Sequence, residues 1–138
     1  MLKFKVNGKK FLNDLTKTKE QIKKNVASDS FEILEIVNKH TEPLVPLETG
    51  ELRASILKNP KGMLVEGDYM SQEITYSAKN KRTGFDYALI QHENYEYRHT
   101  VGQWLYLTDG IIASEGEVYR LIEKDIDSAM AQTLKGGR

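Results

Sequence analysis

A long helical pattern near the N-terminus constrains this chain more than any other feature. From Phe11 to about Thr41, apolar residues recur at steps that place them on one side of a helix. The stripe contains Leu15, Ile22, Val26, Ile33 and Val37. At about 1.5 Å per residue, an unbroken helix would be roughly 45 Å long, so we predict an element that spans the whole molecule. Ser28-Asp29-Ser30 falls inside the pattern and is the place where the helix could kink or divide.

The segments before and after this helix predict other structure. Leu2, Phe4 and Val6 alternate with lysines in the N-terminal arm, residues 1–10, and predict a short strand there. At the other side, Pro43 and Pro46 end the helix, because proline disfavours helical geometry in the residue before it.

The remainder of the sequence, after Pro46, predicts a small sheet followed by a second helix. Runs of β-branched and aromatic residues bounded by turn residues predict strands at 63–65, 73–76 and 85–90. Ser114 and Glu117 fit a capping box that would begin the last helix. Its apolar stripe contains Val118, Tyr119, Ile122, Ile126 and Met130.

These elements together predict the fold class. We expect a single α+β domain over residues 1–138, with a long N-terminal helix, a small antiparallel β-sheet and a C-terminal amphipathic helix packed on one sheet face. Residues 135–138, which contain two glycines, should form a frayed tail.

Composition narrows the possible functions. The chain has 20 Lys+Arg and 20 Asp+Glu, so its formal charge is zero and it lacks the basic excess of most nucleic-acid binders. The absence of cysteine excludes disulfides, thiolate zinc sites and cysteine nucleophiles. The first ten residues lack the continuous apolar stretch of a signal peptide, and no run approaches a membrane span. We therefore expect a soluble protein with no membrane partner.

The polar stretch QHENYEYRHTVGQ, residues 91–103, is the strongest candidate for a catalytic or metal site. His92, Glu93 and His99 are suitable metal ligands, and a metal-dependent enzyme that uses them is one alternative. The two histidines are seven residues apart, whereas a zinc-binding helix needs a spacing of four. Ser55 and Ser77 lie in no nucleophile motif, and no glycine belongs to a phosphate-binding loop. We therefore expect no catalytic, metal or cofactor site and interpret the stretch as a structural and contact loop.

Two stretches contain the aromatic residues and arginine that protein interfaces favour. They are residues 87–99 and 104–106. We expect the contacts to lie in the exposed parts of the loops at 78–84 and 91–103 and at the termini. The candidate interface residues are Lys81, Arg82, His92, Tyr95, Tyr97, Arg98, His99 and Trp104.

Two segments, taken together, resemble a known family. Pro46-Leu-Glu-Thr-Gly-Glu-Leu-Arg-Ala-Ser-Ile56 resembles a signature of tailed-phage neck proteins, the head–tail connector or tail-completion proteins often called minor capsid proteins. The matching positions are Pro46, Glu48, Thr49, Gly50, Leu52, Arg53 and Ser55. Asp86-Tyr-Ala-Leu-Ile-Gln-His-Glu93 resembles a second family segment through Tyr87, Ala88 and Glu93. Asn94 departs from the glycine that many members have there.

The resemblance implies a non-enzymatic structural virion protein that joins the DNA-filled head to the tail. It implies a homo-oligomeric ring in the virion neck, made in the host cytoplasm, with DNA at most passing through its channel. The implied partners are a portal-side head-completion protein and a tail terminator or tail-tube protein. A tail-terminator-type protein at the tail end is the alternative within the same class.

Overall fold

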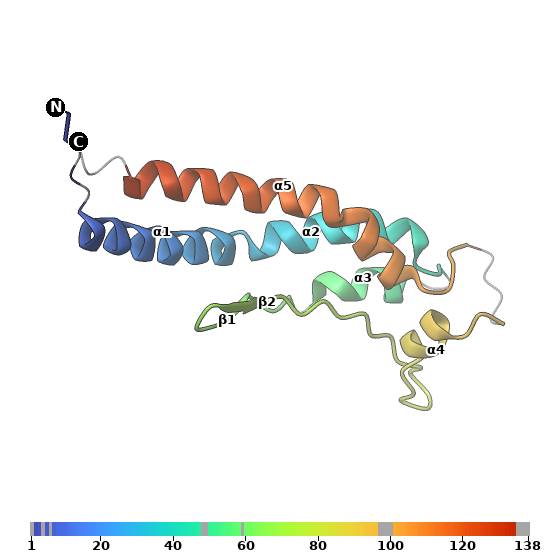
Figure 1. Ribbon diagram of the computed structural model, residues 1–138. Coiled ribbons are helices and arrows are strands. Elements are labelled where there is room, and N and C mark those ends of the chain that lie inside the picture. Colours follow the sequence, from blue (N-terminus) through green and yellow to red (C-terminus); the bar gives the residue numbers. More distant parts are fainter. Residues whose placement is uncertain are drawn as a thin grey trace.

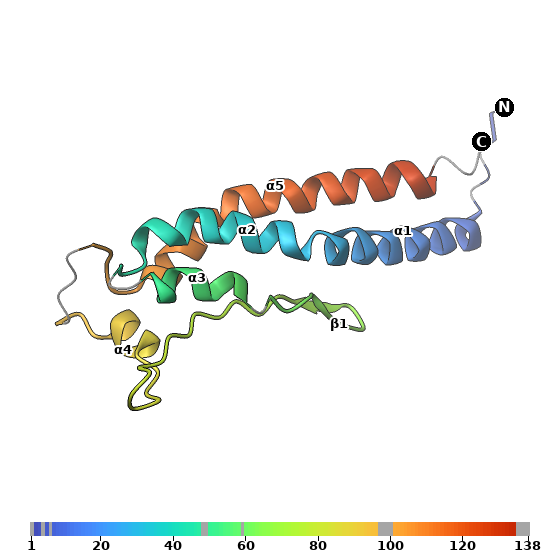
Figure 2. The same ribbon diagram turned by 180° about the vertical axis from the view of Figure 1, so that it is seen from behind.

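Two long layers of helix lie side by side and antiparallel in the computed structural model (Figures 1 and 2). The structure describes residues 2–3, 5, 7–47, 50–58, 60–96 and 101–134, with Lys58 described by its backbone alone. One layer is α1 (Gly8–Ser28) continued by α2 (Ser30–Thr41), and the other is α5 (Tyr106–Leu134). The start of α1 and the end of α5 lie at the same end of the molecule.

The break between α1 and α2 confirms the division predicted at Ser28-Asp29-Ser30. Asp29 separates the helices, and its N–H donates to the carbonyls of Asn25 and Val26, each at 3.2 Å. The Ser28 hydroxyl also donates to the Asn25 carbonyl at 2.7 Å. These competing bonds use carbonyls at the end of α1, and the chain then re-enters a helix at Ser30.

The strand predicted in the N-terminal arm is wrong for the part of the arm that the structure describes. Leu2, Lys3 and Lys5 adopt no strand, and Phe4 and Val6 lie outside the described residues. The helix begins earlier than predicted, because Asn7 caps it. The Asn7 side chain accepts a hydrogen bond from the Lys10 amide at 3.1 Å, which satisfies an amide of the first turn.

Short elements connect the long helices. They are the 3₁₀ turn η1 (Glu42–Leu44), the helix α3 (Glu51–Lys58), the strands β1 (Leu64–Glu66) and β2 (Tyr69–Ser71), and the helix α4 (Ala88–Glu93). The strands form an antiparallel hairpin in the register Leu64↔Ser71, with Gly67 at φ 58° in the turn. Such a positive φ favours glycine.

Two of the predicted strands are wrong. Residues 73–76 follow the hairpin but pair with no strand, because the ladder ends at Ser71. Residues 85–90 contain the start of α4 instead. There the Asp86 carboxylate accepts the Ala88 amide at 3.0 Å and supports the first helical turn, although the segment is rich in strand-forming residues.

The last helix begins at Tyr106, eight residues before the predicted cap at Ser114. Leu105 precedes it with a φ of 52°, and the Leu105 carbonyl accepts the Asp109 amide at 2.9 Å. Ser114 lies inside the helix, buried, and its hydroxyl donates to the Ile111 carbonyl at 2.8 Å. A serine that bonds back to its own helix resembles a cap in the sequence alone.

Two apolar clusters hold the elements together. The larger joins α2, α3, α4 and the start of α5 through Leu34, Val45, Leu52, Ile56, Tyr76, Ala78, Ala88 and Tyr106. The smaller consists of Val26, Ile33 and Leu121, with Met70 of the hairpin and Val118 and Ile122 of α5 packed against it. The predicted α+β class is therefore confirmed, with the N-terminal helix, the antiparallel sheet and the C-terminal helix in the predicted order.

Helix α5 lies against the end of α2 at a short distance. A Cβ added to Gly110 would lie 2.2 Å from the Thr41 hydroxyl oxygen and 2.8 Å from the Thr41 Cα. Thr41 is fully buried, and its hydroxyl donates to the Val37 carbonyl at 2.7 Å. Only glycine fits at residue 110 without moving one helix away from the other.

Gly110→Ala should therefore destabilise the fold by about 3 kcal/mol, because the methyl group meets backbone as well as side-chain atoms. Gly116→Ala on the same helix is the matched control, since a Cβ there meets nothing within 4 Å. It should stabilise the fold by about 0.5–1 kcal/mol through helix propensity. Urea denaturation followed by circular dichroism measures both, and equal effects would contradict the close approach.

Asp125 is a buried acid on α5 that faces the junction of α1 and α2. Burial and the neighbouring Asp29 carboxylate raise the pKa of Asp125 to about 6. A carboxyl whose pKa is higher in the folded than in the unfolded state stabilises the fold below the unfolded pKa. That contribution is lost as the pH rises through the folded pKa.

Asp125→Asn should therefore stabilise the protein at pH 8 by about 2 kcal/mol, with the difference shrinking toward pH 4, where the native carboxyl is protonated. The control is Glu115→Gln, which removes an exposed acid from the same helix. Thermal melts at several pH values provide the measurement. A difference that does not depend on pH would show that the Asp125 carboxyl is not the cause.

Candidate binding site

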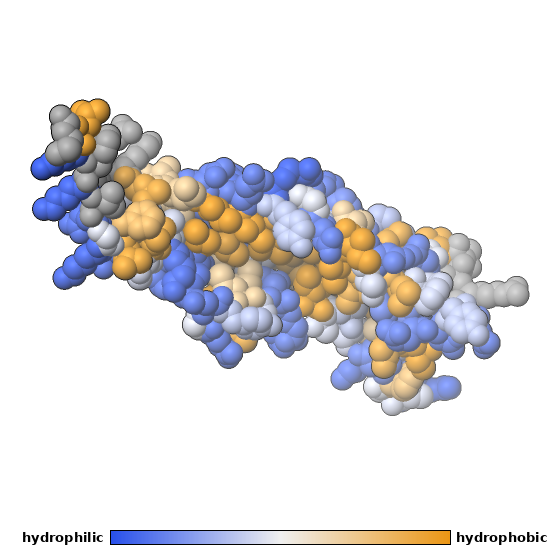
Figure 3. All heavy atoms as spheres, in the orientation of Figure 1, coloured by the Kyte–Doolittle hydropathy of each residue, from blue (hydrophilic) through white to orange (hydrophobic). Residues whose placement is uncertain are grey.

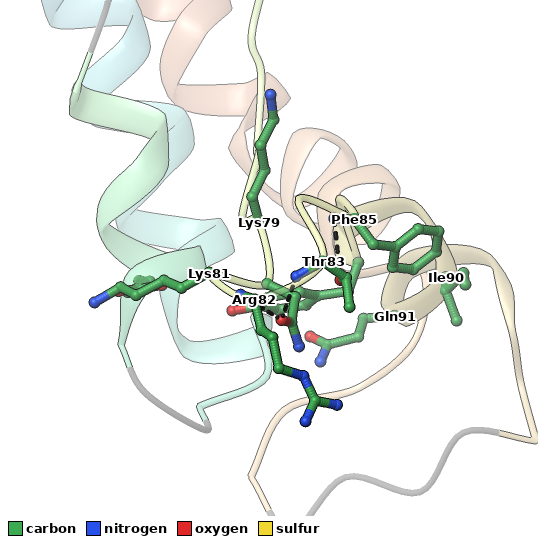
Figure 4. A pocket seen from close by; sticks show the side chains of 10 residues that line it. Lys79, Lys81, Arg82, Thr83, Phe85, Ile90 and Gln91 are labelled. Carbon is green, nitrogen blue, oxygen red and sulfur yellow. Dashed lines mark hydrogen bonds and ion pairs between the residues drawn. The ribbon is translucent and has the colours of Figure 1, made fainter.

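A cavity of about 610 Å³ lies where the loop at residues 79–86 meets α3 and α4 (Figure 4). We call it the loop cavity. Its lining includes Glu51, Lys79, Lys81, Arg82, Phe85, Tyr87, Ile90 and Gln91. The volume is in the range of small-ligand and peptide side-chain pockets.

Short-range hydrogen bonds fold the loop into a compact turn. Lys79 and Asp86 form an isolated antiparallel bridge at its base, and the Asn80 amide donates to the Phe85 carbonyl at 2.8 Å. The Asn80 side chain accepts the amides of Arg82 and Thr83 at 3.0 and 3.2 Å. This is the local bonding that makes asparagine a turn residue, and it fixes the backbone from which Lys81 and Arg82 extend.

Asp86 anchors the loop to the body of the protein. Its carboxylate accepts the Ser77 hydroxyl at 2.6 Å and the amides of Ala78 and Ala88 at 3.2 and 3.0 Å. Partial burial alone would raise the pKa of Asp86. The hydrogen bonds from Ser77, Ala88 and Ala78 outweigh it and lower that pKa, so the carboxylate stays charged and fully bonded.

Three cations surround the loop cavity at separate positions. Lys81 extends toward α3, where its Nζ lies 3.3 Å from the Glu51 carboxylate, whereas Lys79 and Arg82 extend in other directions (Figure 4). Among the described residues, no acidic side chain forms an ion pair with Lys79 or Arg82. The cavity therefore has a positive rim whose charges are spread apart, and the Asp86 carboxylate offsets that of Lys79 only in part.

The floor of the cavity combines apolar surface with an unpaired polar group. Phe85 and Ile90 lie next to each other on one side (Figure 4). Gln91 of α4 is buried, and its side-chain oxygen has no hydrogen-bond partner within the described parts of the chain. A buried acceptor without a partner costs roughly 1–3 kcal/mol. Because this oxygen is itself buried, a ligand would remove that cost only by turning the Gln91 side chain toward the cavity and bringing an N–H donor to it.

The structure divides the predicted interface residues into groups. Lys81 and Arg82 line the loop cavity, and Tyr95 and Trp104 form an edge-to-face ring pair with centroids 6.2 Å apart. His92 lies instead in a second hollow of about 510 Å³ beside Tyr106. Tyr97, Arg98 and His99 lie outside the described residues.

The residues of the presumed family signature are structural where the structure describes them. Gly50 has a φ of 79° and leads into α3, and Leu52 belongs to the larger core cluster. Arg53 donates through Nε to the Val45 carbonyl at 3.0 Å. The Ser55 hydroxyl donates to the Leu52 carbonyl at 2.7 Å and accepts the Ser77 amide at 3.0 Å. Thr49 lies outside the described residues.

The other signature positions lie around α4 and the chain that enters α3. Tyr87 is the residue before α4 and contributes to the loop cavity, and Ala88 is buried in the core. The backbone of Pro46 lies against Gly102, where an added Cβ would be 2.6 Å from the Pro46 Cα. Glu93 is exposed at the end of α4.

The structure gives the metal-dependent alternative no support in the part of the chain that it describes. His92 Nδ1 lies 2.7 Å from the Glu93 carboxylate, and His92 Nε2 lies 3.3 Å from the Thr108 hydroxyl. Both ring nitrogens are therefore engaged by neighbours. No group of three histidine or acidic side chains in the described residues is placed to hold a metal ion, and His99 is not among them.

Sequence reasoning placed Lys79 and Gln91 only within the broader contact loops at 78–84 and 91–103, and it did not connect Glu51, Phe85 or Ile90 with them. A lone Gln on a short helix carries no signal, and charges at a loop look solvated in sequence. The one usable signal was Asn80 with Gly84, which marks a tight turn that brings its flanking charges together.

One named relative was found by comparison with known proteins. The chain is 31% identical over 113 residues to a putative competence-damage inducible protein of Clostridioides difficile (strain 630). The match covers 77% of this chain but only 23% of the relative, so the chain spans about a quarter of the length of that protein. No protein-family model matches the chain, and no solved structure matches it.

This relative contradicts the predicted phage neck family and the head–tail function inferred from it, including the tail-terminator alternative. It is named as a bacterial competence-damage inducible protein, and no phage structural protein stands beside it. The physical reason for the error is visible in the structure. The signature residues form turns, core contacts and backbone hydrogen bonds that many small folds need. The predicted ring, its partners and the virion location remain untested predictions. Among the described residues, no helix combines the length and the apolar character that a membrane span needs.

Replacing Gln91 by the similarly shaped methionine should stabilise the free protein by about 1 kcal/mol, because it removes an unpaired buried acceptor. Gln132→Met, at an exposed position near the end of α5, is the control and should change the stability by less than about 0.5 kcal/mol. Urea denaturation provides the measurement. A loss of stability in Gln91→Met would show that the Gln91 side chain is already paired.

Proposed function

We propose that this chain is a non-enzymatic protein-binding module whose loop cavity binds an acidic segment of a partner protein. The observation that carries the proposal is the combination of a positive rim with a buried, unpartnered acceptor. Lys79 and Arg82 supply positive charge, which Asp86 offsets only in part through its electrostatic interaction with Lys79, and the Gln91 oxygen lacks a donor. An extended peptide offers both carboxylates for the rim and backbone N–H groups for the floor.

The spread of charge favours a peptide over a single small anion. A phosphate or sulfate site brings several donors to one point, whereas these cations point away from one another around a wide cavity (Figure 4). Phe85 and Ile90 add an apolar wall that an aliphatic side chain of the segment can cover. We therefore expect the segment to alternate acidic and apolar residues.

The same features argue against nucleic acid as the ligand. A phosphate backbone presents only acceptors to Gln91, and the chain as a whole has no net positive charge with which to release counterions. The name of the relative from Clostridioides difficile describes induction and mentions no substrate, so the proposal rests on the cavity.

The test uses fluorescein-labelled peptides of about ten residues and fluorescence polarisation. A peptide that alternates Glu or Asp with Leu should bind with a micromolar Kd, and affinity should fall as salt is raised. Arg82→Ala should weaken binding about fivefold, since one exposed charge contact contributes about 1 kcal/mol. Arg120→Ala, an exposed arginine on α5, is the matched control and should leave the Kd unchanged.

Gln91→Met provides a second variant with a distinct signature, because it should weaken peptide binding although it stabilises the fold. Two results would contradict the proposal. One is equal binding of the acidic peptide and a matched Lys-Leu peptide. The other is tighter binding of a single-stranded DNA oligonucleotide of the same length than of the acidic peptide.

A further inference from the structure

The end of the molecule opposite the loop cavity has an apolar face that no described residue covers. It is formed by the first half of α1 and the last turns of α5, and we call it the arm face. Its exposed apolar residues are Phe11, Leu12, Leu15, Met130 and Leu134. Figure 3 shows apolar side chains gathered at this end and along the line where α1 and α5 lie side by side.

The arm face exists because, toward this end, the contact between α1 and α5 is made by small and polar residues. Ala129 of α5 is fully buried, Thr18 of α1 shares a hydrogen bond with Thr133, and the Asn25 side chain donates to the Asp125 carbonyl at 3.2 Å. The larger apolar residues of both helices therefore lie beside this contact. An antiparallel pair with such a face normally packs against further helices.

The hairpin covers only part of this surface. Met70 of the hairpin, Ile22 of α1 and Ile122 of α5 all pack against the smaller core cluster. A hollow of about 440 Å³ is lined by Met70, Ile22 and Leu15. Beyond the hairpin, toward the end of the arm, Leu12 remains 63% exposed and Met130 44% exposed.

The charged residues of α1 and α5 beside the arm face indicate which kind of partner could bind there. The first half of α1, residues 8–19, contains four lysines and one acidic residue, a net charge of +3. The last turns of α5, residues 126–134, contain one acidic residue, Asp127, and no basic residue, a net charge of −1. The charges also lie beside the apolar residues. Lys19 lies four residues after Leu15 on the same side of α1, and Asp127 lies three residues before Met130 on α5.

We propose that the arm face binds a second copy of this chain, with α1 of each copy lying over α5 of the other. In this two-fold arrangement every neighbouring pair of helices is antiparallel and opposite in charge, as in an antiparallel four-helix bundle. The other face-to-face arrangement stacks α1 on α1 and places +3 against +3. The self-complementary pattern matches a copy of the same chain better than a partner of one charge sign.

The arm face is small, because the hairpin limits the contact to the last turns of the arm. Stable interfaces bury roughly 800 Å² on each partner, and a few partly exposed side chains bury less. The dimer should therefore be weak, with a dissociation constant on the order of 100 μM.

Sedimentation equilibrium of the full chain between about 5 and 500 μM provides the first test. The weight-average mass should rise from one copy toward two, and Leu12→Glu should keep it at one copy throughout. The control is Ile112→Glu, at an exposed apolar residue of α5 away from the arm, which should dimerise as the native chain does. Circular dichroism confirms that both variants are folded.

A charge exchange tests the arrangement itself. Asp127→Lys and Lys19→Asp should each weaken self-association about tenfold, because like charges then meet across the two-fold axis. An equal mixture of the two variants should regain native affinity, since every pair is again opposite in sign. Asp68→Asn is the control for Lys19, whose Nζ lies 3.1 Å from Asp68 in the same copy, and it should not weaken the dimer.

A chain that stays monomeric at 500 μM would overturn the proposal, as would a mixture of charge variants that associates no better than either alone. Neither result bears on the loop cavity. Leu12→Glu should bind the acidic peptide with unchanged affinity, so failure of the dimer and failure of the proposed function can be told apart.

Discussion

The close approach of α5 to the layer of α1 and α2 is the constraint on which the rest of the structure depends. Besides the smaller core cluster, it depends on residues that are small or whose polar groups pair locally. Gly110 lies against the backbone of Thr41, Ala129 is fully buried, and the hydroxyls of Thr41 and Ser114 bond back to their own helices. With the start of α5 held at this distance, Tyr106 enters the larger core cluster and its hydroxyl donates to the Ala88 carbonyl at 2.9 Å. That bond connects α5 to α4, and α4 carries Gln91 of the loop cavity.

The same contact explains why the molecule exposes so much apolar surface. A seam of small residues brings two helices close together, but it cannot bury the large side chains on their flanks. At the α2 end, α3 and α4 cover these flanks and form the larger cluster. Along the middle, the hairpin covers them through Met70. At the free end of the arm, no described element covers them, so the two proposed binding surfaces lie at opposite ends of one helical layer.

The sequence predicted the parts of the fold that depend on local chemistry. The helix break at Asp29, the end of the helical layer before Pro43, and the first strand of the hairpin all follow from residues that act on their own backbone. The prediction from sequence failed where contacts between distant parts of the chain determine the secondary structure. Residues 85–90 have strand propensity, yet the Asp86 carboxylate begins a helix there. Ser114 resembles a cap, yet it is a buried residue in the interior of α5.

The candidate site shows the same limit. Lys81 and Arg82 could be predicted as interface residues because they are charged and lie in a loop, but nothing local indicates that Gln91 lies beneath them. The presumed phage signature failed for a related reason. Gly50 and Leu52 are needed for a turn and a core contact, and such needs recur in unrelated proteins. Short patterns built from such residues report a local structure rather than a function.

A dimer formed through the arm face would determine where its two loop cavities lie. A two-fold axis that runs along the arms leaves both copies pointing in the same direction, so the two loop cavities lie at the same end of the dimer. A partner with two acidic segments joined by a flexible linker can then occupy both cavities, and the second binding step becomes intramolecular. Effective concentrations for short flexible linkers are in the millimolar range, well above a micromolar Kd.

Binding of such a partner also favours the dimer, since it binds the paired state more tightly than the single copy. A weak contact between arms is therefore compatible with a tight complex, and the small size of the arm face would make assembly depend on the partner.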